Sequence, residues 1–350
     1  TFFDLYGEED QAALRSFVYK TVVFFATQVR ERFGNIPVMF TLGNNDSYAG
    51  DYQLVPGGAF LADTAEAFYN TLLLGRADRE NYFSTYPTGG YFVAEPPGAK
   101  VLFVCVNSIL FSSHRTDGCT DSANNAGTMQ LDWLEQVLKK AQADKKKVFM
   151  VSHIPTGTSV YSTVKKYMDA SGKISDAAVF WKESCQNRFL EICRQYESVI
   201  EIIFSGHTHM DEYRLILDRD GEAYKADIVT PAVSPQFGNN PAFKVLTLRG
   251  EDWKPLDSRS VNCDLALSSP DFSTYYVFSE AYFMEASLEE SLVDLFPKMA
   301  IDTGDRQQWA HFYYSGHDDA NIIDDITWPA YWCGIGKMGK GEYIECVNSY

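Results

Sequence analysis

The chain has 350 residues, of which 45% are hydrophobic and 15% aromatic, and its formal net charge is −17. This composition excludes a disordered chain and favours one large domain with a smaller appendage. The negative charge argues against a nucleic acid bound on a broad basic surface, and no apolar run approaches the roughly 18 residues of a membrane span.

Apolar periodicity and turn residues predict the elements in chain order. Helices are expected over 8–33, within the loop-rich region 55–85, and over 128–143, 175–196, 287–299, 306–314 and 322–328. Strands are expected over 37–42, 101–107, 148–152, 199–204, 212–217, 226–230 and 243–248. Strands alternate with helices early and cluster late, which suggests a mixed sheet, or two packed sheets with helices outside.

Seven cysteines favour disulfides and an oxidising compartment. If Cys185 and Cys193 lie on one helix, they are about 12 Å apart, beyond disulfide reach, so buried apolar roles are at least as plausible for them. The protein is expected to be extracytoplasmic, either secreted or in a vacuolar or lysosomal lumen. Local spacing makes two pairs plausible, Cys333 with Cys346 and Cys105 with Cys119.

Three of the predicted strands end in residues that can bind a transition metal. Asn44 follows the first, His153 follows a central one, and Gly206-His207-Thr208-His209 follows the next. Reacting groups gather at the carboxyl ends of strands in open α/β sheets, so these side chains are expected to converge on one rim. Neutral imidazoles suit a transition-metal site.

In this order, the motifs Gly43-Asn44-Asn45-Asp46, a lone His153 after a strand, and Gly206-His207-Thr208-His209 resemble the last three signatures of calcineurin-like metallophosphoesterases. Segments 152–157, 206–213 and 234–241 are similar to the acid sphingomyelinase-like phosphodiesterases of that superfamily. The resemblance covers most of the chain. It implies an α/β fold, a four-layer αββα sandwich of mixed sheets with a small C-terminal helical cap. The implied domains are a catalytic domain over 1–285, lacking its N-terminal portion, and a helical subdomain over 286–350.

The resemblance also implies two divalent metal ions that activate water for attack on a phosphodiester or phosphoanhydride. Asn44, His153 and His207 would bind one ion, and His209 the other. Zinc suits imidazole-rich ligation, and iron or manganese stay open. The family's upstream Asp-x-His and Gly-Asp motifs do not appear in the chain. We therefore expect the chain to be the C-terminal portion of a longer protein, with an N-terminal fragment completing the metal site.

Asn45 stands where the family usually has a histidine thought to protonate the leaving group, and Asn45 and His153 are the expected catalytic residues. An amide cannot act as a general acid near neutral pH. A leaving group of low pKa needs less protonation, which predicts nucleotide or anhydride-type substrates over sphingomyelin. Vacuolar endopolyphosphatases resemble the chain in the Gly-Asn-Asn-Asp motif, which supports polyphosphate. A phospholipid headgroup stays open, because an upstream histidine could supply the proton.

Four residues are candidate substrate contacts: Tyr48, Asp51, Asn239 and Asn240. Asp46 is expected to shape its turn, and the sequon at Asn45 to be unmodified, because a glycan there would block the metal rim. His114, His311 and His317 are expected to have surface or core roles. Two alternative functions are a binding protein on the same fold that has lost catalysis, and a metal-dependent hydrolase of a non-phosphate bond.

Overall fold

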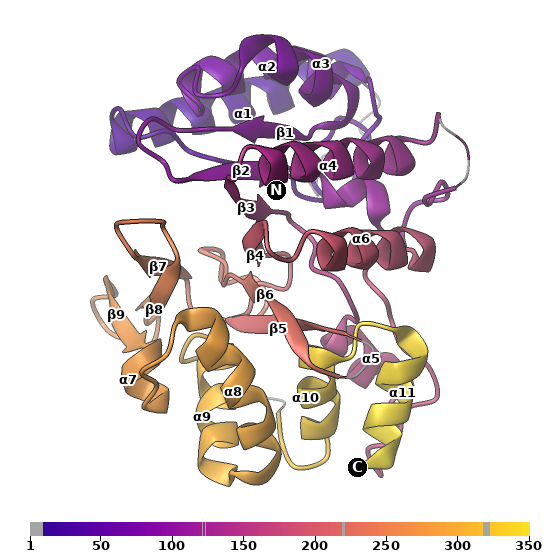
Figure 1. Cartoon of the computed structure of the whole chain (residues 1–350), viewed down its shortest axis with the longest axis vertical. Coiled ribbons are helices and arrows are strands. Elements are labelled where there is room, and N and C mark those ends of the chain that lie inside the picture. Colours follow the sequence, from indigo (N-terminus) through magenta and orange to yellow (C-terminus); the bar gives the residue numbers. More distant parts are fainter. Residues whose placement is uncertain (1–9, 121, 123, 219–220, 318–322) are drawn as a thin grey trace.

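The computed structural model describes residues 10–120, 122, 124–218, 221–317 and 323–350, and it has an α/β fold with two sheets (Figure 1). A six-stranded mixed sheet has the order β1-β2-β3-β4-β6-β5, and a three-stranded antiparallel sheet has the order β7-β8-β9. Helices lie outside both sheets. The predicted fold class is confirmed.

The helices are α1 (Gln11–Phe33), α2 (Ala59–Thr71), α3 (Arg79–Gly89), α4 (Ala126–Ala143), α5 (Val160–Tyr167), α6 (Glu183–Gln195), α7 (Phe278–Tyr282), α8 (Leu288–Ile301), α9 (Thr303–Tyr313), α10 (Trp328–Gly336) and α11 (Lys340–Ser349). The strands are β1 (Phe92–Ala94), β2 (Val101–Cys105), β3 (Lys147–Val151), β4 (Ile200–Ser205), β5 (Glu212–Leu217), β6 (Ala223–Val229), β7 (Ala242–Leu248), β8 (Pro255–Cys263) and β9 (Phe272–Val277).

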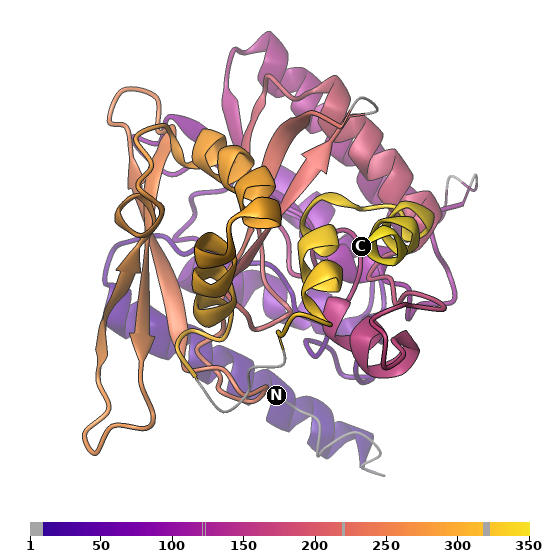
Figure 2. The same ribbon diagram turned by 90° about the horizontal axis from the view of Figure 1, so that it is seen from below.

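The centre of the larger sheet is parallel: β2, β3, β4 and β6 run in one direction, and β1 and β5 are antiparallel edges. Its strands are apolar on both faces because both faces are covered. Val148 and Met150 pack in the core shared with α4 and α6, whereas Phe149 packs in the core shared with α8, α9 and α10. Figure 2 shows the smaller sheet on one side of α8 and α9, with α10 and α11 on the other.

Three predicted elements differ from the structure. Segment 37–42 is not a strand, because it makes isolated hydrogen bonds and no strand ladder. The Val38 N–H donates to the Leu72 carbonyl, and the Thr41 hydroxyl donates to the Val106 carbonyl. The helix predicted from residue 175 begins at Glu183, since isolated bridges at Ile174, Val179 and Trp181 hold the preceding chain extended. Residues 323–327 precede α10 as turns, and residue 322 lies outside the described part.

Six elements of the structure were missing from the predicted list: α5, α7, α11, β1, β8 and β9. Strand β8 is polar in composition, with Asp257, Ser258, Arg259, Ser260 and Asn262. It lies between β7 and β9, so the ladder bonds on both sides define it as a strand even though its apolar pattern is weak.

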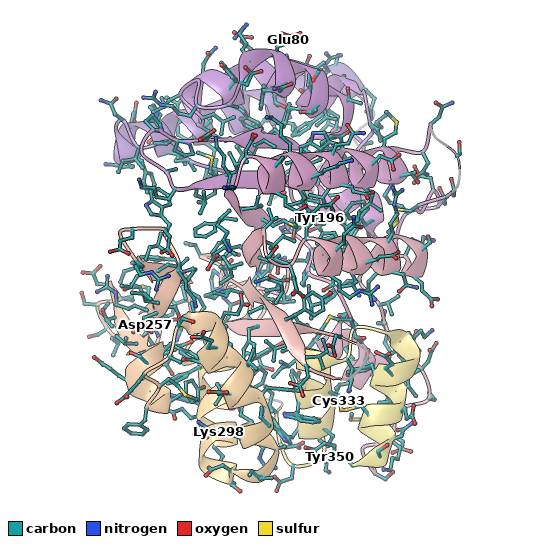
Figure 3. The ribbon with its side chains drawn as sticks, viewed as in Figure 1. Glu80, Tyr196, Asp257, Lys298, Cys333 and Tyr350 are labelled. Carbon is teal, nitrogen blue, oxygen red and sulfur yellow. A yellow bond between two sulfur atoms is a disulfide. The ribbon has the colours of Figure 1, made fainter. Side chains whose placement is uncertain are left out.

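Two disulfides are present among the described residues. Cys333–Cys346 joins α10 to α11 as predicted (Figure 3), but Cys119 bonds to Cys185 and not to Cys105. The prediction for Cys105 was wrong because this residue lies in β2, buried as a free thiol, and the 3-10 turn and bends that follow β2 bring Cys119 to Cys185 on α6. Cys185 is buried but bonded, whereas Cys193 is a buried free thiol as expected.

No helix in the described ranges is long and apolar enough to cross a membrane.

Candidate metal centre

Three side chains meet at the ends of the central strands. His153 follows β3 and His207 follows β4, and these strands are parallel neighbours, so the two residues leave the sheet at the same edge. The Nε2 atom of His153 lies 3.2 Å from the Nδ1 atom of His207. The Oδ1 atom of Asn44 lies 2.9 Å from the first nitrogen and 3.2 Å from the second. The predicted convergence of Asn44, His153 and His207 is therefore present.

The backbone around His207 and His209 is unusual. Their φ angles are 71° and 69°, in the left-handed region that few non-glycine residues adopt. The Gly206 N–H donates to the His153 carbonyl at 2.9 Å, which ties the two histidine loops together. Such backbone strain persists where the surrounding structure enforces it, and it is concentrated at functional sites.

Both central imidazoles are held neutral. Burial, reinforced by repulsion from the neighbouring histidines, lowers the pKa of His153 to about 3 and that of His207 to about 4. Burial also lowers the pKa of His209, which contributes to the shift of His153 and therefore lies near the cluster. Neutral imidazole is the form that binds metal.

The donor set fits a divalent metal. Around a tetrahedral zinc ion with bonds of roughly 2.0–2.1 Å, donor atoms lie about 3.3–3.4 Å apart, close to the separations of Asn44, His153 and His207. The Nδ1 atom of His209 is buried and has no hydrogen-bond partner among the described residues, so it is available as a further donor. Within the described ranges, no group of three His, Cys, Asp or Glu residues could hold an ion. The centre therefore depends on the amide oxygen of Asn44.

Neighbouring residues orient these donors. The Asn44 Nδ2 group donates to Asp51 at 2.7 Å, which leaves the Asn44 oxygen directed at the histidines. The Tyr52 hydroxyl lies 3.2 Å from the Nε2 atom of His207, and its ring stacks on that of His114 at 4.3 Å. The sequence prediction omitted Tyr52 and assigned His114 no role in the site. The sequence signal for Tyr52 was its position, because it follows Asp51 in the loop that returns to Asn44.

The remaining predicted residues lie around the centre. Tyr48 points away, because its hydroxyl donates to Asp63 on α2 at 3.0 Å. Asn239 and Asn240 are 0% and 1% exposed, and their amides donate to backbone carbonyls, so they brace the loop after β6. The substrate-contact role of Tyr48, Asp51, Asn239 and Asn240 stays a prediction. Asn45 lies partly buried in the same turn as Asn44.

Asp46 shapes the turn as expected. Its Oδ2 atom accepts the Gly43 N–H at 2.7 Å, and burial raises the pKa of its carboxyl group.

Sequence comparison identifies relatives of the chain. Residues 7–211 match the family model described as calcineurin-like phosphoesterase. Cyclic GMP-AMP phosphodiesterase SMPDL3A of Mus musculus is 25% identical, over 95% of this chain and 73% of that protein. Acid sphingomyelinase-like phosphodiesterase 3b of Homo sapiens is 23% identical, over 91% and 68%. Sphingomyelin phosphodiesterase B of Dictyostelium discoideum is 25% identical, over 91% and 49%.

Proposed function

Because the chain belongs to the calcineurin-like phosphoesterase family, we propose that it hydrolyses a phosphodiester or phosphoanhydride with metal-activated water at Asn44, His153, His207 and His209. The observation that carries this proposal is the convergence of three uncharged donor atoms within 3.2 Å of one another. Zinc is the proposed metal, because two of the three donors are imidazole nitrogens.

The bound metal pair would supply a nucleophilic hydroxide and neutralise charge on the phosphoryl oxygens. The residues of the chain hold and orient the side chains that would bind the metal. Asp51 fixes the Asn44 amide, and Tyr52 fixes the plane of the His207 ring. Asn45 has no proton to give near neutral pH, so the leaving group departs without an acid from this residue.

The substrate we propose is a nucleotide-type ester or anhydride. Relatives at 24–25% identity carry the name cyclic GMP-AMP phosphodiesterase, and a sphingomyelin phosphodiesterase is also among the matches. Asn45 favours a nucleotide joined through an anhydride, because a phosphate leaving from an anhydride needs less protonation than the alkoxide that leaves from a sphingolipid or a sugar ester.

Metal analysis combined with one assay tests the proposed function. The purified protein is expected to contain tightly bound zinc and to hydrolyse bis(p-nitrophenyl) phosphate, and a chelator should abolish this activity. His207→Ala should lower kcat/KM by more than a hundredfold. His311→Ala is the matched control, since this exposed histidine on α9 contacts Tyr275 and Phe312. Metal without turnover would instead support the binding-protein alternative.

Leaving-group dependence tests the role of Asn45. Across aryl phosphodiesters of graded leaving-group pKa, we expect log kcat to fall steeply as that pKa rises. Asn45→His should flatten the dependence by adding an acid. A flat dependence in the unmodified protein would refute the inference that the site lacks a general acid.

We further propose that a carboxylate-bearing N-terminal fragment completes the second ion's ligands. A hollow of about 420 Å³ between the two sheets supports this proposal, because it opens beside His153 and Gly206 and is lined by Phe40, Phe103 and Phe204. Intact-mass measurement tests it: a companion fragment or a mass above 39.5 kDa is expected. A mass of 39.5 kDa alone, with two metal ions bound, would overturn it.

The proposed location is extracytoplasmic, in the secreted fraction or a vacuolar or lysosomal lumen. Two disulfides fit an oxidising compartment.

A further inference from the structure

A pocket of about 560 Å³ adjoins the metal centre. His207 is one of its lining residues, and α5, β5 and the end of α9 line it as well. Two phenylalanines link the pocket to the histidines. The Phe180 ring meets that of His207 at 5.5 Å, and the Phe237 ring meets that of His209 at 4.6 Å. A group attached to a phosphorus atom at the metal centre can therefore extend into this pocket.

The pocket also contains a buried ion pair. Glu212 and Arg214 are two positions apart on β5, so both side chains lie on the same face of the strand, the face that lines the pocket. Their side chains are 4% and 1% exposed, and the Arg214 Nη2 atom lies 3.2 Å from Glu212 Oε2. The Arg214 Nη1 atom donates to the Gly334 carbonyl on α10 at 2.6 Å. These bonds fix the guanidinium and, through it, the carboxylate.

Two polar atoms of this pair have no hydrogen-bond partner among the described residues: Oε1 of Glu212 and Nε of Arg214. Leaving a buried charged group unsatisfied is costly, so such an atom calls for a ligand or a bound water. Oε1 accepts and Nε donates. A quaternary ammonium head group has no N–H to offer the carboxylate, and Arg214 repels it. A nitrogen heterocycle offers both an N–H donor and an acceptor.

We propose that this pocket binds the base of a nucleotide-type substrate, with Glu212 accepting a hydrogen bond from an N–H group of the heterocycle. Arg214 positions Glu212, and the aromatic rings of Phe180 and Phe237 contact the face or edge of the base. This inference rests on the proposed function, because it specifies which part of the proposed nucleotide-type substrate binds beside the same site. It assigns specificity to two residues of β5 that lie immediately after the histidine loop.

Calorimetric binding to the zinc-loaded protein tests the assignment. The probes are adenosine 5′-monophosphate, ribose 5-phosphate, which lacks the base, and phosphorylcholine. We expect the monophosphate to bind at least tenfold more tightly than either of the other two. In Glu212→Gln, the ratio of Kd values between ribose 5-phosphate and the monophosphate should fall about tenfold, as expected for a hydrogen bond to a charged group. The ratio removes any change common to both phosphates.

Two further variants keep the test decisive. Glu289→Gln is the matched control, because Glu289 is likewise an ion-paired glutamate but is only partly buried and pairs with Lys225 outside the pocket. It should leave the ratio unchanged. Phe237→Ala changes a side chain that is 53% exposed, so folding should survive, and the ratio should fall several-fold.

Equal binding of the monophosphate and ribose 5-phosphate would overturn the assignment, leaving a water-filled cavity only. Tighter binding of phosphorylcholine would also overturn it, in favour of a cation pocket. If bis(p-nitrophenyl) phosphate is hydrolysed but the ratio is near one, only this inference fails. If no metal binds and no ester is hydrolysed, the proposed function fails.

Discussion

At the residue scale, the metal centre depends on the orientation of one amide. Asn44 can direct either its oxygen or its nitrogen at the histidines, and only the oxygen can bind a cation. Asp51 selects the oxygen, because its carboxylate accepts the amide N–H at 2.7 Å. Asp51, which was predicted to contact substrate, therefore contacts a candidate metal ligand in the structure.

Asp51→Ala is expected to lower zinc affinity by about 10–100-fold, the usual cost of losing a partner that orients a metal ligand. Competition with a chromogenic chelator measures the affinity. Tyr48→Phe, in the same loop, loses only a bond to Asp63 and should bind zinc normally. Unchanged affinity in Asp51→Ala would show that Asn44 is oriented by other contacts.

Asp227 on β6 predicts a pH dependence of stability. Burial raises the pKa of this carboxyl group from 3.8 to about 7. Between these values the folded state binds more protons than the unfolded state, so the free energy of unfolding falls as pH rises from about 4 to 7. Asp227→Asn should remove this loss, with a gain on the order of 4 kcal/mol at pH 8 relative to pH 4.

Urea unfolding across this pH range measures the effect. The neutral histidines give the opposite slope: the unfolded state binds the extra protons between about 3 and 6.5, so their contribution rises with pH. The comparison must therefore be variant against unmodified protein at each pH. Asp325→Asn, at an exposed carboxylate, is the control, and a parallel shift in both variants would contradict the assignment to Asp227.

At the element scale, the histidine loop is joined to the second sheet by one buried carboxylate. Asp211 ends the loop, and each strand of the smaller sheet supplies it with a partner. Lys244 of β7 lies 2.7 Å away, Ser260 of β8 donates at 2.5 Å, and Tyr276 of β9 donates at 3.0 Å. The smaller sheet therefore positions the loop that holds His207 and His209.

Lys244→Met should destabilise the protein by about 3 kcal/mol, because it leaves Asp211 buried without a counter-charge. Adding Asp211→Asn should recover part of that loss, since the uncompensated charge is gone. A double-mutant cycle in chemical denaturation measures the coupling. Strictly additive effects would contradict a direct ion pair.

At the scale of the whole molecule, the C-terminal helices are part of the main structure. Helices α8 and α10 pack in the same core as β5 and β6, and α10 supplies the carbonyl that holds Arg214. Gly334 is required there, because a Cβ atom would lie 2.5 Å from Val160. The division into domains at residue 285 stays a prediction.

The two disulfides should contribute unequally to stability. Cys119–Cys185 closes a separation of 66 residues and Cys333–Cys346 one of 13, and in the loop-entropy description longer loops gain more. Paired Cys→Ser replacement should cost about 4 kcal/mol for the first and about 3 for the second. Denaturant midpoints of the two double variants measure the difference, and an equal or reversed order would contradict this description.

Apolar patterning and motif order were enough to predict the α/β class, two of the three strands expected before the candidate metal ligands, and the convergence of Asn44, His153 and His207. The strands are predictable because buried strands are apolar, and the three side chains are recognisable because their motifs are local in sequence. The packed structure was needed to show the partner of Cys119, the lack of a strand ladder at 37–42, and the ion pair of Glu212 with Arg214 beside the site. Each depends on which distant segment packs alongside, and neither apolar periodicity nor residue spacing carries that information.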